Sequence, residues 1–246
     1  MNNAIFNAGT PEAVLWEFLS YPLHTAEDIL KRFSDLPRAV QKKGDGLRQA
    51  FVYIPGTRDD AATLIAHADT VFSFEGEHKM VYENDIISSA QDTVGIGADD
   101  RAGCALLWLL RDGGHNILVI GGEEFGQPAA HYLVSHHPDI LKEIQNSSFM
   151  IEFDRRTAKA YITYNIPVTT KFRKYIERET NYEEIEKSGI TDICILCTEG
   201  CCGVNVSVSY YNAHHSNEYI NLKEWLYNYE VVSKMLAKPL KKYRLK

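Results

Sequence analysis

Histidines and acidic residues stand at the ends of several apolar runs of this chain. The set consists of His67 and Asp69 after TLIA, Asp99 and Asp100 after the glycine-rich turn VGIGA, Glu123 and Glu124 after ILVIGG, Asp154 after FMIEF, and His214 and His215 after VNVSVSYYNA. The first four positions follow one another at intervals of roughly 30 residues, about the length of one strand-helix-strand unit. Such a spacing returns the chain to the same edge of a sheet, so we expect these side chains to line one pocket.

A pocket of this composition is suited to a metal ion. Imidazole and carboxylate ligands together favour zinc, manganese or cobalt over calcium, which prefers oxygen ligands alone. Taken singly, each residue has a simpler explanation as a surface or capping residue, and Asp100 is a candidate cap for the helical run that follows it. Taken together they include a buried acidic pair, which is costly without a cation. The sequence therefore predicts a metal site.

The segments that must position these residues alternate between strand and helix. Strand-like runs are QAFVYIPG, TLIAH, NILVIGG, SFMIEF and GVNVSVSYY, and helical patterns cover PEAVLWEFLSY, TAEDILKRFSDL with Thr25 as N-cap, DRAGCALLWLLRDGG, Ala129 to Gln145 with a break at HHPD, VTTKFRKYIERET, NYEEIEKSG and LKEWLYNYEVVSKMLAK. This order predicts a three-layer α/β/α sandwich around a mixed, mostly parallel sheet. In such sheets ligands bind beyond the carboxyl ends of the strands. No linker or repeat divides residues 1–246, so we expect a single domain.

The composition limits the classes of partner. The 246 residues are 45% hydrophobic and 24% charged, as in an ordinary soluble domain. A net charge of -7 and a pI near 5.7 argue against nucleic acid or an anionic membrane as a partner. The N-terminus does not have the pattern of a secretory signal, and the longest apolar run, CALLWLL, is too short to span a bilayer. We expect a cytoplasmic protein with a small-molecule or peptide partner, and the sequence does not predict its oligomeric state.

Four of the five cysteines lie close together, at Cys194, Cys197, Cys201 and Cys202. We interpret them as reduced, partly buried thiols. The alternative is a zinc-binding, metal-sensing or redox cluster, but a second Cys-x-x-Cys pair at matching spacing and a thioredoxin-like flank are both missing.

Five motifs in order, AHADTV, GIGADDRAG, GGEEFG, EFD and HHSNEYI, resemble those of the co-catalytic di-zinc exopeptidases. This superfamily contains tripeptidase T, carboxypeptidase G-like enzymes and single-domain zinc aminopeptidases. The resemblance runs from about Thr63 to Leu222. Many members insert a lid or dimerisation domain between the fourth and fifth ligands, but here Asp154 and His214 are only about 60 residues apart. We therefore expect the catalytic domain without a lid domain.

The resemblance implies a role for each matched residue. His67 and Asp154 would bind one divalent metal ion, Glu124 and His214 a second, and Asp99 would bridge both. The ions would be zinc, with manganese or cobalt as alternatives. Asp69 would hold the imidazole of His67 through its other nitrogen. Glu123 would be the general base for a water molecule shared by the two ions.

The last ligand is either His214 or His215. In the superfamily it usually stands four residues before a glutamate, and Glu218 favours His214 by that criterion.

The function that these motifs favour is metal-dependent exopeptidase activity on short peptides. Without a lid to grip a substrate carboxylate, we favour an aminopeptidase. Alternatives are an N-acyl amino acid or small-amide amidohydrolase, a carboxypeptidase, and a non-catalytic binding protein, against which the intact Glu123-Glu124 pair argues. Asp192 is a candidate contact for a substrate amine, with a capping or loop role as the alternative. Arg155 and Arg156 are candidates for binding a carboxylate, although arginines after a strand end are more often exposed to solvent or paired with acids.

Overall fold

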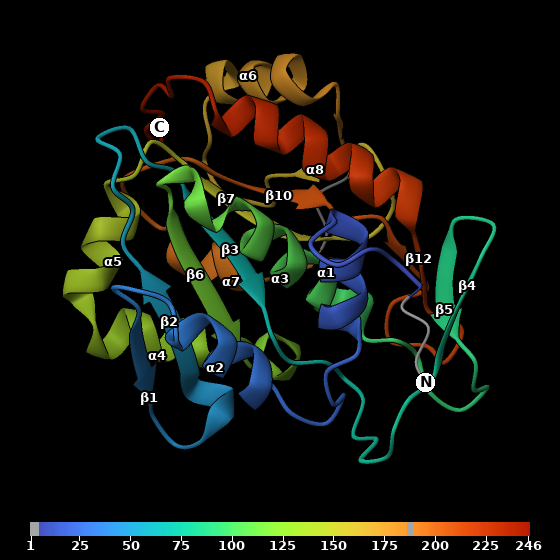
Figure 1. Ribbon diagram of the computed structural model, residues 1–246. Helices are drawn as coiled ribbons and strands as arrows, with labels where there is room; N and C mark the ends of the chain where they lie inside the picture. The colour runs from blue at the N-terminus through green and yellow to red at the C-terminus, as the bar shows by residue number, and fades with distance from the viewer. Residues whose placement is uncertain (1–4, 186–188) are drawn as a thin grey trace.

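The computed structural model describes residues 5–185 and 189–246 and contains an eight-stranded sheet with helices on both faces (Figure 1). The strand order is β1-β2-β6-β3-β7-β10-β8-β9. The bounds are β1 (Val40–Lys43), β2 (Ala50–Ile54), β3 (Thr63–His67), β6 (Asn116–Gly121), β7 (Met150–Arg155), β8 (Ala160–Ile162), β9 (Glu183–Glu184) and β10 (Gly203–Ser207). The four central strands β6, β3, β7 and β10 run parallel, whereas β1, β2 and β8 form antiparallel pairs. The predicted mixed, mostly parallel sheet is confirmed.

The helices form the two outer layers of the sandwich. On one face lie α1 (Pro11–Leu19), α2 (Glu27–Ser34), α3 (Ala98–Leu110), α6 (Thr170–Thr180) and α8 (Leu222–Leu236), and on the other α4 (Pro128–His136), α5 (Pro138–Gln145) and α7 (Asp192–Leu196). Short 3₁₀ helices cover η1 (Leu47–Gln49), η2 (Arg111–Gly113) and η3 (Glu123–Phe125). Because both faces are covered, β3 and β6 are buried along their whole length. Their apolar runs therefore show no alternation.

Two local predictions are wrong. The N-cap position of α2 is Ala26 and not Thr25, although the Thr25 hydroxyl still accepts a hydrogen bond from the Glu27 N–H at 3.1 Å. The helix predicted over 181–189 is absent from its described part: Asn181 ends α6 in the left-handed conformation that is typical after a helix, and Glu183–Glu184 form β9. The remaining residues of that prediction, 186–188, lie outside the described ones.

A second, four-stranded sheet was not predicted. Its order is β11 (Tyr210–Tyr211), β12 (Tyr219–Asn221), β5 (Ile86–Ser89) and β4 (Met80–Glu83), with antiparallel pairs throughout. A two-residue turn joins β4 and β5, where Asn84 and Asp85 both have positive φ, as two-residue hairpins require. This sheet ties the segment before Asp99 to the segment after His214, so it helps to position both.

The segment between Asp154 and His214 belongs to the same architecture. Its described residues form β8, α6, β9, α7, β10 and β11, all within the two sheets and the helical layers, and they contain no separate lid. Within residues 5–185 and 189–246, none of the helices combines the length and the apolar character needed to cross a membrane.

Candidate metal centre

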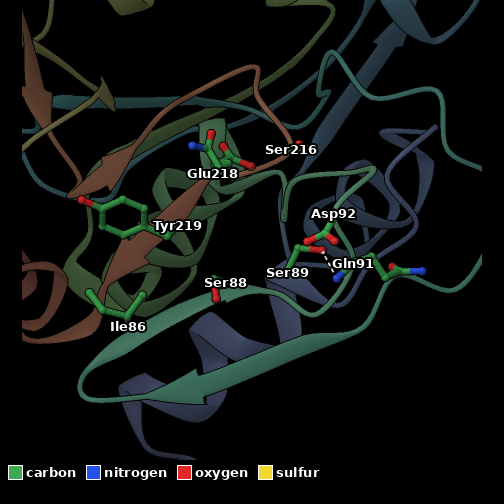
Figure 2. Close-up of a pocket in the computed structure, with 9 residues that line it drawn as sticks. Ile86, Ser88, Ser89, Gln91, Asp92, Ser216, Glu218 and Tyr219 are labelled. Atoms are coloured by element: carbon green, nitrogen blue, oxygen red, sulfur yellow. Dashed lines mark hydrogen bonds between the residues drawn. The ribbon is translucent and has the colours of Figure 1, made fainter.

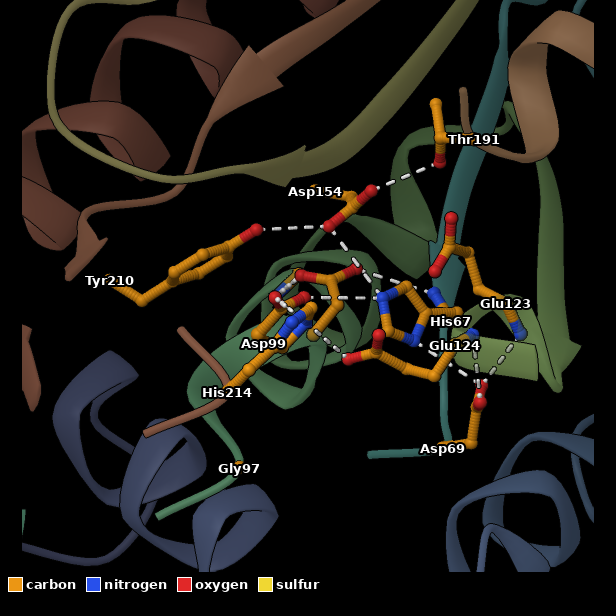
Figure 3. Close-up of polar contacts among 12 residues, drawn as sticks. His67, Asp69, Gly97, Asp99, Glu123, Glu124, Asp154, Thr191, Tyr210 and His214 are labelled. Carbon is orange, nitrogen blue, oxygen red and sulfur yellow. Dashed lines mark hydrogen bonds and ion pairs between the residues drawn. The ribbon is translucent and has the colours of Figure 1, made fainter. Parts of the chain in front are cut away.

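The predicted ligand residues come from five separate segments and lie together beyond the central strands (Figure 3). His67 is the last residue of β3, and Asp154 lies near the end of β7. Glu124 lies in η3, directly after β6, and Asp99 lies at the start of α3. His214 comes from the loop between β11 and β12. The parallel strands thus deliver three of the five side chains to one edge of the sheet, as the spacing indicated.

His67 lies between three carboxylates. Its Nε2 is 3.3 Å from Asp99 Oδ1 and 3.6 Å from Asp154 Oδ1, while its Nδ1 is 3.3 Å from Asp69 Oδ1. Burial opposes a positive charge on this imidazole, but the three carboxylates outweigh burial and raise the pKa of His67 well above its usual value. The site therefore attracts positive charge.

His214 faces a second part of the same cluster. Its Nε2 is 3.0 Å from Glu124 Oε1 and 3.2 Å from Asp99 Oδ2, and half of its side chain is exposed. The two oxygens of Asp99 therefore face two different histidines. His215 has an exposed side chain whose Nδ1 lies 2.8 Å from the Ala213 carbonyl oxygen. The structure brings His214, and not His215, to the cluster.

The atoms that face one another in this cluster fit a cation. Both ring nitrogens of His67 and Oε1 of Glu124 are buried, and none makes a hydrogen bond of good geometry within the described part of the chain. Two groups have potential ligand atoms within 4.8 Å of one another: His67 with Asp99 and Glu124, and His67 with Asp100 and Asp154. Buried polar atoms without partners are costly, and a metal ion would satisfy them.

Asp100 is part of the second group, but its oxygens already have partners. Oδ1 accepts the Gly103 N–H at 3.0 Å, and Oδ2 accepts the His67 N–H at 3.3 Å. The backbone of Asp99 and Asp100 is not helical, and regular helical geometry begins at Arg101. Asp100 therefore caps the first turn of α3 and joins that turn to β3, in line with the capping alternative.

Asp69 has a wider role than support of one imidazole. Its Oδ1 accepts hydrogen bonds from the N–H groups of Gly122 at 2.6 Å and Glu123 at 3.0 Å, and its Oδ2 accepts from Glu124 N–H at 3.2 Å. One buried carboxylate thus contacts the His67 ring and fixes the η3 turn, which carries Glu123 and Glu124. The sequence predicted the first contact only.

Glu123 points toward the cluster without an ion pair to either histidine. Its Oε1 accepts a hydrogen bond from Gln127 Nε2 at 2.9 Å. Burial, together with the charge of nearby Asp154, raises the pKa of Glu123 to about 7. A carboxyl group with that pKa exchanges protons readily at neutral pH.

Asp154 is held by residues that no sequence motif singled out. The Tyr210 hydroxyl donates to Oδ1 at 3.0 Å, and the Thr191 hydroxyl lies 3.0 Å from Oδ2. Asn205 joins the same network, since its Oδ1 accepts the Asp154 N–H at 3.1 Å. These partners orient the carboxylate toward His67.

Glu218 anchors the loop that carries Asp99. Its Oε2 accepts the N–H groups of Ile96 at 3.0 Å and Gly97 at 2.6 Å, and its Oε1 accepts the N–H of Asp99 at 3.1 Å. In the sequence, Glu218 only served to favour His214 over His215 as the last ligand. Its side chain is fully buried, and burial raises its pKa to about 8.

A hollow of about 620 Å³ adjoins this anchor (Figure 2). It lies between β5, the loop through Gln91 and Asp92, and residues 216–219. Because the oxygens of Glu218 are engaged by the 96–99 backbone, they are not available to a ligand in the hollow. The hollow is therefore distinct from the metal-ligand cluster.

The two arginines that are candidates for binding a substrate carboxylate are not part of the predicted set of metal ligands. Arg155 follows Asp154 directly in β7 and is partly exposed, and Arg156 is exposed. Among the described residues neither arginine forms an ion pair within 4.0 Å.

The cysteines face separate backbone carbonyls. Thiols of Cys197, Cys201 and Cys202 donate to the carbonyl oxygens of Cys201, Ile144 and Arg244, respectively. No group of metal-ligand atoms found in the described residues includes a cysteine. This favours the interpretation as reduced structural thiols over a metal-binding cluster.

Solved structures with the same fold include peptidases and a cyclase. Aminopeptidase PepT from Bacillus cereus aligns with a TM-score of 0.70 and 14% identity, over 93% of this chain and 98% of that one. A tripeptidase from Staphylococcus aureus gives 0.69 and 14%, over 94% and 98%. A glutaminyl cyclase from an Acidobacteriales bacterium gives 0.61 and 13%, over 94% of each chain. No protein-family model and no curated protein sequence matches the chain.

These similarities confirm the expected fold, which this chain shares with an aminopeptidase, a tripeptidase and a glutaminyl cyclase. At 13–14% identity they establish the architecture and leave the activity to be argued from the site itself.

Proposed function

We propose that residues 1–246 form a single metal-dependent exopeptidase domain that removes the first residue of short peptides. The observation that carries this proposal is the convergence of two histidines and three carboxylates from five segments. Both ring nitrogens of His67 and Oε1 of Glu124 are buried there without a hydrogen bond of good geometry among the described residues. Similarity to an aminopeptidase and a tripeptidase supports peptides as the substrate class.

Five residues would hold two divalent cations, with zinc as the expected metal and manganese or cobalt as alternatives. His67 and Asp154 would bind one ion, Glu124 and His214 the other, and Asp99 both, since its two oxygens face the two histidines. Such a pair, when bound, lowers the pKa of a water molecule and polarises the scissile carbonyl group.

Glu123 would act as the general base. It would accept a proton from the attacking water and donate it to the departing amine. Gln127 orients its carboxyl group by a hydrogen bond, and Asp69 fixes its backbone. Adjacent side chains of the η3 turn thereby serve two purposes: Glu124 binds metal and Glu123 transfers protons.

The test is a Glu123→Gln variant assayed on a substrate panel. The panel contains aminoacyl anilides, N-acyl amino acids, peptides with a blocked N-terminus and peptides that begin with glutamine. We expect turnover of the aminoacyl anilides by the native protein and a loss of roughly 10²- to 10⁴-fold in the variant, with metal content unchanged.

The matched control is Glu230→Gln, which replaces an exposed glutamate on α8 that pairs with Lys234. It should leave turnover at the native level. Full turnover by Glu123→Gln would refute the assigned base. Preference of the native protein for N-acyl amino acids would instead establish the amidohydrolase alternative, and bound metal without turnover of any substrate would favour a binding protein.

A further inference from the structure

Two buried carboxyl groups beside the candidate metal centre have no cationic partner among the residues that the structure describes. Building on the exopeptidase function proposed above, we propose that Asp192 and Glu152 bind the positively charged α-amino group of the substrate's first residue.

Glu152 lies in β7 two residues before Asp154, and the Thr191 hydroxyl group contacts both carboxylates. Its side chain is only 1% exposed. One oxygen, Oε1, lies 3.0 Å from the Thr191 hydroxyl and accepts the Ile193 N–H at 3.3 Å. The other oxygen, Oε2, is buried without a hydrogen-bond partner among the described residues. Oε2 of Glu152 therefore lacks a hydrogen-bond donor among these residues.

Asp192 is the first residue of α7 and is also 1% exposed. Its Oδ1 is buried and has no partner in the described part of the chain. Within residues 5–185 and 189–246, neither Asp192 nor Glu152 forms an ion pair with a lysine, arginine or histidine. Buried polar oxygens without a donor are costly, and the N–H groups of an ammonium group would satisfy both of them.

Thr191 joins Glu152 to Asp154. Its single hydroxyl group is 3.0 Å from Glu152 Oε1 and 3.0 Å from Asp154 Oδ2. A hydroxyl group has only one hydrogen to donate, but each of these oxygens has a second donor, the Ile193 N–H for Glu152 and Asn205 Nδ2 for Asp154. The oxygens without a donor are therefore Glu152 Oε2 and Asp192 Oδ1.

The position of this acid pair matches the start of a substrate. Thr191 joins Glu152 to the predicted ligand Asp154, and Glu123 is the neighbouring charge that most raises the pKa of buried Asp192. Glu123 is itself partly exposed. The α-amino group of a peptide is close to its first carbonyl group, so a site for that amino group should lie beside the proposed base.

An ammonium group suits the pair better than a third metal ion does. It has three N–H donors, enough for the free oxygens of Asp192 and Glu152 together. No group of three metal-ligand atoms found among the described residues includes either side chain. The pair should therefore select substrates with a free amino terminus and exclude N-acylated ones, which lack the charge.

The experiment compares two small ligands on the metal-loaded protein by calorimetry. Leucinamide has the α-amino group, and 4-methylpentanamide is its analogue without that group. The native protein should bind leucinamide roughly 10- to 100-fold more tightly, as expected for a charged hydrogen bond. Asp192→Asn should remove most of this preference, and Glu152→Gln should reduce it. The control is Asp112→Asn, whose side chain is 85% exposed and lies on η2. It should keep the full preference.

The outcomes separate this inference from the proposed function. Equal binding of the two ligands by the native protein would overturn the inference, and so would a full preference in a folded Asp192→Asn or Glu152→Gln variant. Binding requires no turnover, so a protein that prefers the amine but hydrolyses no substrate would support the amine site and refute only the peptidase. Conversely, hydrolysis of aminoacyl anilides with an unchanged KM in Asp192→Asn would refute the amine site alone.

Discussion

Replacing Asp69 by alanine should destabilise the protein and weaken metal binding at the same time. The substitution leaves the N–H groups of Gly122, Glu123 and Glu124 without their acceptor. An unsatisfied buried N–H costs about 1–3 kcal/mol. Gly122 is buried and should incur the full cost, whereas water can reach the partly exposed Glu123 and Glu124. We therefore expect a total near the lower limit for three groups, about 3 kcal/mol.

For a chain of this length, each kcal/mol lowers Tm by about 2–4 °C, so Tm should fall by roughly 6–12 °C. Thermal unfolding of chelator-treated protein measures this effect separately from metal binding. Zinc affinity, measured by competition with a chelating dye, should fall about 10- to 100-fold because the His67 ring loses its support. Asp69→Asn keeps one acceptor oxygen and should show a smaller loss in both measurements.

The control for this comparison is Asp112→Ala, because the Asp112 side chain is largely exposed. A native Tm in Asp69→Ala would refute the hydrogen-bond reasoning. An unchanged zinc affinity would refute the role of Asp69 behind His67, even if Tm falls.

Three further predictions address the supports of the site. Glu218→Gln should weaken zinc binding without changing a proposed ligand. The amide has only one oxygen that can accept hydrogen bonds, whereas the two oxygens of Glu218 accept the N–H groups of Ile96, Gly97 and Asp99. Zinc titration checks this, and a native zinc affinity would contradict it. Gly122→Ala should lower Tm more than Gly126→Ala. Both glycines have positive φ, but only a Cβ atom at position 122 would lie 2.4 Å from the Arg48 carbonyl oxygen. Equal decreases in Tm, measured by thermal unfolding, would argue against that close approach. The metal-free protein should lose stability as pH rises from about 4.5 to 8. Burial raises the pKa of Glu218 to about 8 and that of Glu123 to about 7 in the folded state, so the folded state binds more protons than the unfolded chain over this range. Denaturant unfolding at pH 5 and pH 8 in the presence of a chelator tests the sign, and higher stability at pH 8 would contradict the prediction.

The central strands were predictable because burial on both faces makes their sequences continuously apolar. TLIAH and NILVIGG correspond to β3 and β6, and the polar residues that end them mark the edge of the sheet. The hairpin of β4 and β5 was missed because its strands are short and half-exposed, with little apolar pattern. The consecutive Asn84 and Asp85 were the available signal, since both residues favour the positive φ that such a turn requires.

The candidate site likewise contains residues that sequence patterns predicted and residues that they did not. Residues such as His67 and Asp99 were predictable because each follows a recognisable strand or turn, and motif order placed them in one set. The partners that hold them were not predictable. Tyr210 and Thr191 reach Asp154 from segments far along the chain, and only tertiary packing brings those segments together. Nothing in one sequence distinguishes that tyrosine or threonine from others of its kind.

The most direct test of the account is the metal content of the native chain and of Asp99→Ala, purified without chelator and supplied with zinc. Asp99 is the residue proposed to contact both ions, so its loss should empty the site while Asp112→Ala remains loaded. We predict close to two zinc, manganese or cobalt ions per native chain, as the two sets of ligands require, and little metal in Asp99→Ala. A native chain with little metal, or a variant that keeps its metal, would contradict the proposed centre.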